Sequence, residues 1–271
     1  MPPPFIDRLR AAIPSHVTID GPVGAGGQGT VFLGKCRGSA AAVKVFDAAT
    51  DLRRVDRECT LLAKLTCPHV VRLIEHFNVR INADSLRIVV YEYHPGGDLS
   101  AMLAPGAPPV SEADLIKIGL EAGTGIATLW KFRIVHRDIK PANIVRAADG
   151  RCLLVDVGFA RHLDLSTLTV AGGAPGTRGF RSPEQTAGRK ALTINSDVYS
   201  LGMTLYLLAA KRHPFGGGDI LVPTPVDFAA MSSSRPLSTV FVGLVRQMLE
   251  FTAARRPSDI VTKFSAIAGA P

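Results

Sequence analysis

The stretch HRDIKPAN, residues 136–143, lies between two aliphatic runs near the middle of the chain. It places a histidine, an arginine, an aspartate, a lysine and an asparagine within eight residues. Taken alone, a polar cluster of this kind is typical of a surface turn. The rest of the sequence decides whether it is a turn or a reactive site.

The composition indicates a globular protein. The chain has 271 residues, of which 46% are hydrophobic and 20% are charged, and this is enough for one large domain or two lobes. No period typical of stacked repeats is present. The net charge is +8, but the basic residues are dispersed and only 6% of residues are aromatic. We therefore expect no nucleic-acid partner.

The cysteines and the apolar segments favour a cytoplasmic protein. Four cysteines are scattered without a CxxC pair or a nearby histidine set: Cys36, Cys59, Cys67 and Cys152. Neither a zinc site nor a disulfide framework is expected, and reduced thiols are favoured. The start, MPPPFIDRLR, lacks the order of a secretory signal. The apolar run 198–210 is too short to cross a membrane and predicts a buried helix.

The order of patterns predicts an α+β fold. Short apolar stretches around glycines at 17–45 predict antiparallel strands, and helical spacing at 51–65 predicts one helix. Strands are predicted again at 70–79 and 85–93. The remainder is predicted to be mainly helical, with helices at 112–130, 197–210 and 238–251, a short strand beginning at 152, and loops at 104–110 and 216–236.

Near the start, GAGGQGTV fits a G-x-G-x-x-G-x-V pattern through Gly24, Gly26, Gly29 and Val31. Glycines let backbone amides approach a phosphate closely. The strand that follows argues against the dinucleotide-binding fingerprint, which needs a helix there. A hairpin turn without a ligand is the alternative for this motif taken alone.

Two further positions carry charge in apolar surroundings. Lys44 lies in the apolar strand AAVKVF, where it either faces solvent or needs an anion. Glu58 on the following helix is the candidate anion, and Asp56, on another face of that helix, is the substitute. Asp156 begins DVG after an aliphatic run and marks either a turn or, with Asn143, a pair of oxygen ligands that suits magnesium.

These motifs occur in one order: GAGGQGTV, AVKV, HRDIKPAN, DVG, SPE at 182–184 and DVYSLG at 197–202. In this order the chain resembles a eukaryotic-type serine/threonine protein kinase catalytic domain, similar to small bacterial members, over about residues 18–260. The resemblance implies a bilobal fold in a single catalytic domain. Residues 1–93 would form a small antiparallel-sheet N-lobe with one main helix, and 94–271 a larger, mostly helical C-lobe, with ATP bound in the cleft between them.

The resemblance also implies roles for individual residues. Lys44 would hold the α- and β-phosphates of ATP and pair with Glu58. Asp138 would accept or orient the proton of the attacking hydroxyl, and Lys140 would balance charge on the phosphoryl group. Thr177 would contact the side chains of Asp138 and Lys140. Asn143 and Asp156 would hold Mg²⁺, with Mn²⁺ as the alternative. The implied nucleotide-binding set is Gly24, Ala25, Gly26, Gly27, Gln28, Gly29, Val31, Ala42, Lys44, Tyr91 as gatekeeper, Glu92, Tyr93 and His94 as hinge, and Val145.

Supporting contacts follow from the same resemblance. Glu184 is expected to pair with Arg256, or with Arg255 if the alignment slips by one, and Asp197 to bond the backbone near His136. Arg137 is expected to bind a phosphate on the activation segment. Candidate autophosphorylation sites on that segment are Ser166, Thr167 and Thr169. The main departure is Val157, where the family usually has phenylalanine.

The implied activity is transfer of the γ-phosphoryl group of ATP to serine or threonine hydroxyls of a protein substrate. A pseudokinase would be favoured by loss of Lys44, Asp138, Asn143 or Asp156, and all four are present. Small-molecule kinases usually lack DIKPAN followed by SPE. A regulatory partner or dimer is left open.

Overall fold

The computed structural model describes residues 3–26, 29–47, 52–157, 161–162 and 176–269. The chain divides into two compact units. The first comprises Met1–Thr66 and Val71–His94, and the second comprises Cys67–Val70 and Pro95–Pro271.

The first unit is built on an antiparallel sheet. Among the described residues its order is β1-β2-β3-β5-β4, with strands β1 (Val17–Gly26), β2 (Gly29–Cys36), β3 (Ser39–Phe46), β4 (Leu73–Ile81) and β5 (Asp84–Glu92). Strands β2 and β3 are joined by Arg37 and Gly38, with φ values of 50° and 83°. Positive φ at both turn residues is the geometry that matches the twist of a two-residue hairpin.

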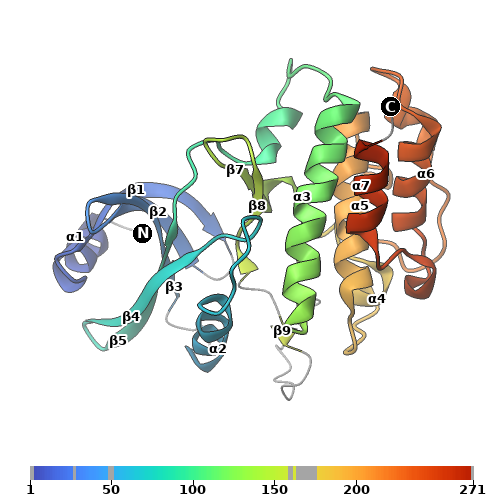
Figure 1. Cartoon of the computed structure of the whole chain (residues 1–271). Coiled ribbons are helices and arrows are strands. Elements are labelled where there is room, and N and C mark those ends of the chain that lie inside the picture. Colours follow the sequence, from blue (N-terminus) through green and yellow to red (C-terminus); the bar gives the residue numbers. More distant parts are fainter. Residues whose placement is uncertain (1–2, 27–28, 48–51, 158–160, 163–175, 270–271) are drawn as a thin grey trace. The chain divides into compact units, whose positions relative to one another are not determined.

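Alternation along the strands gives this sheet two different faces. One face carries Val43 and Val45 and packs against Leu9 and Ile13, from helix α1 (Pro3–Ala12) and the turn after it. The other face carries Val89, which belongs to a buried cluster with Phe46, Val55 and Cys59 that includes helix α2 (Leu52–Leu62). Each face of the sheet thus has its own hydrophobic core. Figure 1 shows the two helices, α1 and α2, on different sides of the sheet.

The second unit is mainly helical. Its helices are α3 (Glu112–Lys131), α4 (Pro183–Thr186), α5 (Ile194–Ala210), α6 (Thr239–Met248) and α7 (Ile260–Ala268), and its strand pairs are β6 (Ile134–Val135) with β9 (Arg161–His162) and β7 (Ile144–Arg146) with β8 (Cys152–Leu154). Helix α3 packs against α5 and α7, and α5 packs against α6 (Figure 1). Side chains of Ser111, Thr193 and Ser238 cap the amino termini of α3, α5 and α6.

Close helix packing explains one glycine in the middle of α3. A Cβ atom built on Gly119 would lie 2.4 Å from the ring of Phe264 on α7.

Helix α5 is buried along nearly its whole length, including the polar side chains of Ser196 and Asp197. No helix among the described residues is both long and apolar enough to span a bilayer.

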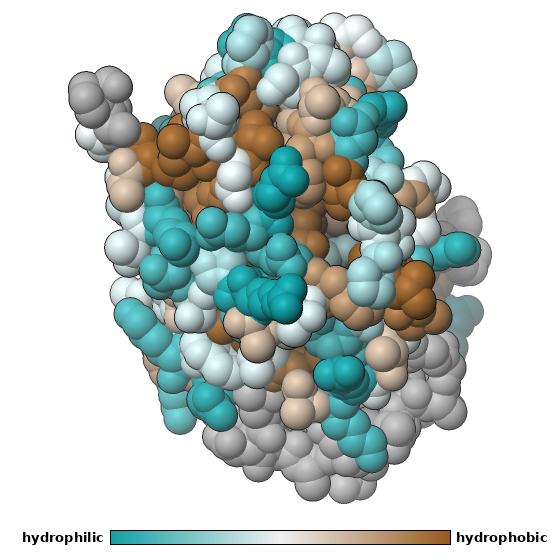
Figure 2. Space-filling view, turned by 90° about the vertical axis from the view of Figure 1, so that its right-hand side faces the viewer, coloured by the Kyte–Doolittle hydropathy of each residue, from teal (hydrophilic) through white to brown (hydrophobic). Residues whose placement is uncertain are grey.

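The surface seen in Figure 2 is mixed, with brown hydrophobic areas interrupted by teal hydrophilic ones. Large hydrophobic side chains that stand out as exposed in the described part are Val23, Leu221, Val222 and Val240. Hydrophobic side chains exposed singly are ordinary on protein surfaces.

The predicted α+β fold class is confirmed: an antiparallel sheet precedes a mostly helical part. The sheet has two helices of similar length, α1 and α2, where one main helix was predicted. The predicted helix at 51–65 is α2, and those at 112–130, 197–210 and 238–251 are α3, α5 and α6. Helices α1, α4 and α7 and the short strands β6, β7 and β9 were not predicted.

Candidate active site

Hydrogen bonds to the buried helix α5 anchor the backbone of the HRDIKPAN segment. Asp197 accepts backbone hydrogen bonds from His136 and Arg137, both at 2.8 Å. Arg137 has a φ of 72°, a left-handed conformation that is uncommon for a residue with a side chain. The predicted contact of Asp197 with this backbone is confirmed, and it holds a strained turn in place.

His136 is fully buried, and its hydrogen bonds have a structural role. Its Nε2 donates to the carbonyl oxygen of Val155 at 3.0 Å, since a carbonyl can only accept. Its Nδ1 then accepts from the amide of Asp138 at 3.4 Å. The ring therefore ties the HRDIKPAN segment to the residue that precedes Asp156.

The carboxylate of Asp138 is only 2% exposed and is surrounded by donors. Its Oδ1 accepts from the amide of Thr177 at 2.7 Å. Its Oδ2 accepts from Asn143 Nδ2 at 2.9 Å and lies 3.0 Å from Lys140 Nζ. Burial raises the pKa of Asp138, but the charge of Lys140 and the hydrogen bonds from Thr177 and Lys140 outweigh it and leave the pKa below its usual range. This carboxylate is ionised at neutral pH.

Lys140 and Thr177 form one unit with Asp138. The ammonium of Lys140 donates to Thr177 Oγ1 at 2.5 Å, so that Thr177 bonds Asp138 through its amide and Lys140 through its hydroxyl. The predicted contacts of Thr177 are confirmed. Gly176, with a φ of 98°, allows this approach, because a Cβ there would lie 2.5 Å from the carbonyl oxygen of Arg137.

Asn143 and Asp156 are joined through the backbone between them. The amide of Val155 donates to the carbonyl oxygen of Asn143 at 3.0 Å, and Asp156 follows with a φ of 57°. Both hydrogen bonds from the Asn143 side chain use its amide nitrogen, which leaves the amide oxygen as the coordinating atom. An amide oxygen and a carboxylate fit a hard divalent cation such as Mg²⁺.

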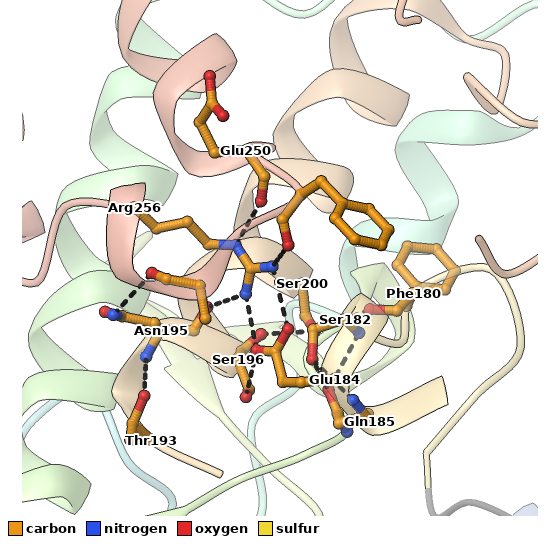
Figure 3. A network of polar contacts seen from close by, with 12 residues as sticks. Phe180, Ser182, Glu184, Gln185, Thr193, Asn195, Ser196, Ser200, Glu250 and Arg256 are labelled. Carbon is orange, nitrogen blue, oxygen red and sulfur yellow. Dashed lines mark hydrogen bonds and ion pairs between the residues drawn. The ribbon is translucent and has the colours of Figure 1, made fainter. Parts of the chain in front are cut away.

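A buried ion pair anchors the SPE segment, as Figure 3 shows. Arg256 donates to both carboxylate oxygens of Glu184, at 2.7 and 3.0 Å. Ser196 on α5 also donates to Glu184, at 2.7 Å, and Arg256 reaches the carbonyl oxygens of Glu250 and Asn195. The predicted partner Arg256, rather than Arg255, is confirmed. Burial raises the pKa of Glu184, but Arg256 and Ser196 outweigh it, and the net pKa lies below its ordinary value.

Two residues of this region were not predicted. Gln185 donates from Nε2 to the carbonyl oxygen of Arg137 at 3.0 Å. Asp219 accepts from the amide of Gly179 at 2.6 Å and pairs with Arg181 at 3.2 Å. Gln185 directly follows SPE and forms a capping box with Ser182, which was the available signal. Asp219 lies in no recognisable local motif, so nothing near it in the sequence marks its role.

In the first unit, four of the predicted nucleotide-binding residues share one face of the sheet: Val31, Ala42, Lys44 and Tyr91. Lys44 on β3 is directly opposite Val31 on β2, and Ala42 is opposite Tyr91 on β5. Directly paired residues, and residues two apart on a strand, point to the same side. Lys44 is buried, with Nζ 4.9 Å from the centre of the Phe46 ring, which corrects the solvent-facing alternative.

The glycine motif forms the β1–β2 hairpin, where Gly24 pairs with Val31 and Gly26 with Gly29. Gly27, Gln28 and the side chain of Ala25 lie outside the described residues. A Cβ at Gly29 would lie 2.1 Å from the carbonyl oxygen of Val45, so this glycine is required by the sheet itself.

The remaining predicted nucleotide-binding residues fall in two places. Glu92 ends β5, its amide donates to the carbonyl oxygen of Arg72 at 3.0 Å, and Tyr93 and His94 follow it. Val145 lies on β7 of the second unit, opposite Leu153.

One ion pair bears on whether Glu58 or Asp56 is the partner of Lys44. The side chain of Glu58 lies outside the described part. Asp56 pairs with the buried Arg87 on β5, which also bonds His76 Nδ1 at 2.7 Å. Asp56 is therefore engaged by a different strand residue.

A model of the protein kinase domain matches residues 17–266 of this sequence. The chain belongs to the protein kinase family. The predicted recognition is thus confirmed over almost the whole chain. Members of this family use ATP and a divalent metal ion and act on protein substrates.

Characterised relatives of this kinase domain are named as serine/threonine kinases. It is 31% identical to serine/threonine-protein kinase pkn2 of Myxococcus xanthus over 95% of this chain and 33% of that protein. It is 32% identical to PrkC of Bacillus subtilis over 72% of this chain and 30% of that protein. The chain spans about a third of the length of these relatives.

Two family features of this kinase domain concern the segment after Asp156. Val157 is buried, so the smaller side chain still packs in the interior. The candidate acceptors Ser166, Thr167 and Thr169 lie outside the described residues.

Proposed function

We propose that this chain transfers the γ-phosphoryl group of ATP to serine or threonine hydroxyls of protein substrates. The observation that carries the proposal is the buried carboxylate of Asp138, which is bonded by Thr177, Asn143 and Lys140. A carboxylate held ionised by fixed donors, with a lysine beside it, is suited to orient a hydroxyl group and to balance charge on a phosphoryl group.

The site residues of the second unit have distinct roles in this proposal. Asp138 orients the acceptor hydroxyl and takes its proton as the new oxygen–phosphorus bond forms. The bond between the γ-phosphorus and its bridging oxygen to the β-phosphate breaks, and ADP leaves. Lys140 places its ammonium beside the Asp138 carboxylate and is oriented by Thr177. Asn143 and Asp156 hold Mg²⁺, which when bound offsets the negative charge of the phosphates.

The first unit contributes the nucleotide-binding residues. The buried Lys44 holds the α- and β-phosphates and pairs with Glu58. The backbone amides of the Gly24–Gly29 hairpin cover the phosphates. Val31, Ala42 and Tyr91, which lie on the same face as Lys44, line the site of the nucleotide.

The preference for serine or threonine rests on Lys140, which lies two residues after Asp138 within DIKPAN. The names of the relatives support the same choice. Autophosphorylation at Ser166, Thr167 or Thr169, with Arg137 as the reader of the phosphate, is part of the proposal. The cytoplasmic location, the regulatory partner or dimer and the division at residue 93 stay predictions.

Incubation of the purified chain with labelled ATP and Mg²⁺, alone and with generic protein substrates, tests the activity. Removal of the Asp138 carboxylate in an Asp138→Ala variant should lower the rate by roughly 10²–10⁴-fold. The matched control is Asp149→Asn, since Asp149 is an exposed aspartate of the same region that bonds only Arg151 among the described residues.

Equal labelling by the wild type and Asp138→Ala would refute the catalytic role of Asp138, and no labelling above background by the wild type would favour a pseudokinase. Phosphotyrosine as the main product would contradict the role given to Lys140. Mass spectrometry that finds Ser166, Thr167 and Thr169 unmodified in the active protein would refute the autophosphorylation sites.

A further inference from the structure

Three side chains with different metal-binding atoms meet in the first unit, and none of them belongs to the proposed nucleotide-binding set. His16 follows helix α1, Cys36 ends strand β2 and Glu75 lies on strand β4. The imidazole nitrogen, the thiol sulfur and a carboxylate oxygen all lie within 4.8 Å of one another.

Backbone contacts fix the positions of these residues. Cys36 is paired with Val17, directly after His16, and the amide of Arg37 donates to the carbonyl oxygen of His16 at 2.8 Å. Glu75 lies where the register of β4 against β5 shifts, and bulges of this kind redirect a side chain. The cluster is therefore built by three separate chain segments that the fold brings together.

The carboxylate of Glu75 has two distinct sides. Its Oε1 lies 2.7 Å from His16 Nε2 and 3.3 Å from Cys36 Sγ. Its Oε2 accepts a hydrogen bond from the guanidinium of Arg37 at 2.8 Å. Carboxylates that bind metals are commonly oriented by an outer hydrogen bond, and Arg37 is in place to supply one.

The cluster is closed on one side and open on the other. Cys36 is buried, whereas the side chain of Glu75 is 20% exposed and that of His16 is 39% exposed. An ion can reach the three atoms from the His16 side, where water can supply a fourth ligand.

We propose that His16, Cys36 and Glu75 bind a zinc ion. Imidazole and thiolate suit a borderline-soft cation and are poor ligands for Mg²⁺ or Ca²⁺. On binding, the thiol of Cys36 loses its proton to solvent, and the proton through which His16 Nε2 bonds Glu75 moves to Nδ1 or to solvent. Water molecules leave the hydrated ion as bonds form from Sγ, Nε2 and Oε1 to the metal.

The three ligand atoms must move to hold a zinc ion, because they lie within 4.8 Å of one another but at unequal distances. Tetrahedral zinc with ordinary bond lengths places such atoms roughly 3.4–3.6 Å apart. The Oε1–Nε2 distance of 2.7 Å must widen and the Oε1–Sγ distance of 3.3 Å is already close. The exposed side chain of His16 can supply most of this movement.

Metal titrations of the whole, chelator-treated chain test the proposal. Excess Mg²⁺ is present so that the oxygen ligands Asn143 and Asp156 are occupied. Competition with a chromophoric zinc chelator should give one Zn²⁺ per chain with a dissociation constant of ~1 µM or tighter. Co²⁺ in place of Zn²⁺ should show near-ultraviolet sulfur-to-metal absorption, which reports a bound thiolate.

Removal of a ligand should weaken zinc binding by more than the roughly 10–100-fold typical of losing an outer hydrogen bond. Cys36→Ser should abolish the cobalt–sulfur absorption, and His16→Gln, at an exposed position, should weaken binding without disturbing the core. The matched control is Cys67→Ser, which should leave the affinity and the spectrum unchanged.

No zinc binding by the wild type, or equal binding by the wild type, Cys36→Ser and His16→Gln, would overturn the proposal and leave a metal-free hydrogen-bond network. Neither readout uses ATP turnover, so this result is independent of the kinase activity proposed above.

Discussion

Asn143 donates from one amide nitrogen to two oxygens of Asp138, the backbone carbonyl at 2.8 Å and Oδ2 at 2.9 Å. A single side chain therefore fixes both the backbone and the carboxylate of the proposed base. It leaves its own amide oxygen for a cation, so the placement of the base and that of the metal are coupled through Asn143.

An Asn143→Asp change should damage the site beyond the loss of a metal ligand. It replaces a donor by a second carboxylate beside Asp138, and a neighbouring like charge raises a carboxyl pKa. In the wild type the pKa of Asp138 is lowered, so the base form is present throughout the neutral range. The acidic limb of the profile of kcat/KM against pH should move to higher pH in the variant.

The loss of a hydrogen bond to a charged group, about 1.5–3 kcal/mol, should also lower kcat by roughly 10–150-fold. Asn78→Asp makes the same chemical change at an exposed position on β4 and should leave the profile unchanged. An unshifted acidic limb in Asn143→Asp would remove Asp138 from the role of base.

Thr177→Val should separate the two bonds of Thr177. The backbone bond to Asp138 remains, whereas the hydroxyl, which accepts from Lys140 and helps to lower the pKa of Asp138, is lost. Because Lys140 is then aimed less well, kcat should fall roughly 10–100-fold, with little change in KM for ATP. Steady-state kinetics at varied ATP concentration measure both.

The control for this change is Thr186→Val on α4. The hydroxyl of Thr186 is buried and makes no hydrogen bond among the described residues, so its removal should leave kcat and stability unchanged. A Thr177→Val enzyme with wild-type kcat would show that the Lys140–Thr177 bond is not needed for catalysis.

Glu184→Gln should lower stability in a manner that depends on pH. Loss of one partner of a buried ion pair costs about 3–5 kcal/mol. The pKa of Glu184 is lowered in the folded state, so its stabilising effect is fully present above the unfolded value of about 4.3 and is lost as pH falls through the folded value. Urea unfolding of both proteins should show a large difference at pH 7 and a smaller one near pH 3.

Glu250→Gln is the matched control, because Arg256 contacts only the backbone of Glu250, whose side chain points away in Figure 3. A Glu184→Gln deficit that stays constant from pH 7 to pH 3 would mean that the charge of Glu184 does not contribute.

A pair of variants on α2 should identify the partner of Lys44. If Glu58 is the partner, Glu58→Gln lowers kcat/KM for ATP. Asp56→Asn should leave the kinetics intact and lower the free energy of unfolding by about 1–3 kcal/mol, because the buried Arg87 loses its negatively charged partner. A loss of activity in Asp56→Asn alone would reverse the assignment.

The sequence predicted those helices and strands that form from a regular local spacing of hydrophobic residues. Leu52, Val55, Cys59 and Leu62 recur at helical spacing, and α2 forms there. Helix α1 was missed because three prolines open the sequence. Pro3, however, is the first residue of α1, a position that proline tolerates, and Leu9 lies in the core.

The candidate site was predictable where function requires adjacent residues, as in HRDIKPAN. It was not predictable where distant residues meet: Asp219 supports Gly179 across forty positions with no signal in its own neighbourhood. The same reason explains why the sequence did not indicate zinc. His16, Cys36 and Glu75 have no ligand spacing along the chain and converge only when β4 returns to the end of β2.

The bonds from Asp197 to the HRDIKPAN backbone have a genetic consequence. Asp197 is buried inside α5 and cannot meet a substrate, yet it sets the conformation of the strained Arg137 turn just before Asp138. A search for inactive alleles should therefore recover changes at Asp197 as often as at Asp138. The first group would fail through a misplaced backbone and the second through a missing carboxylate.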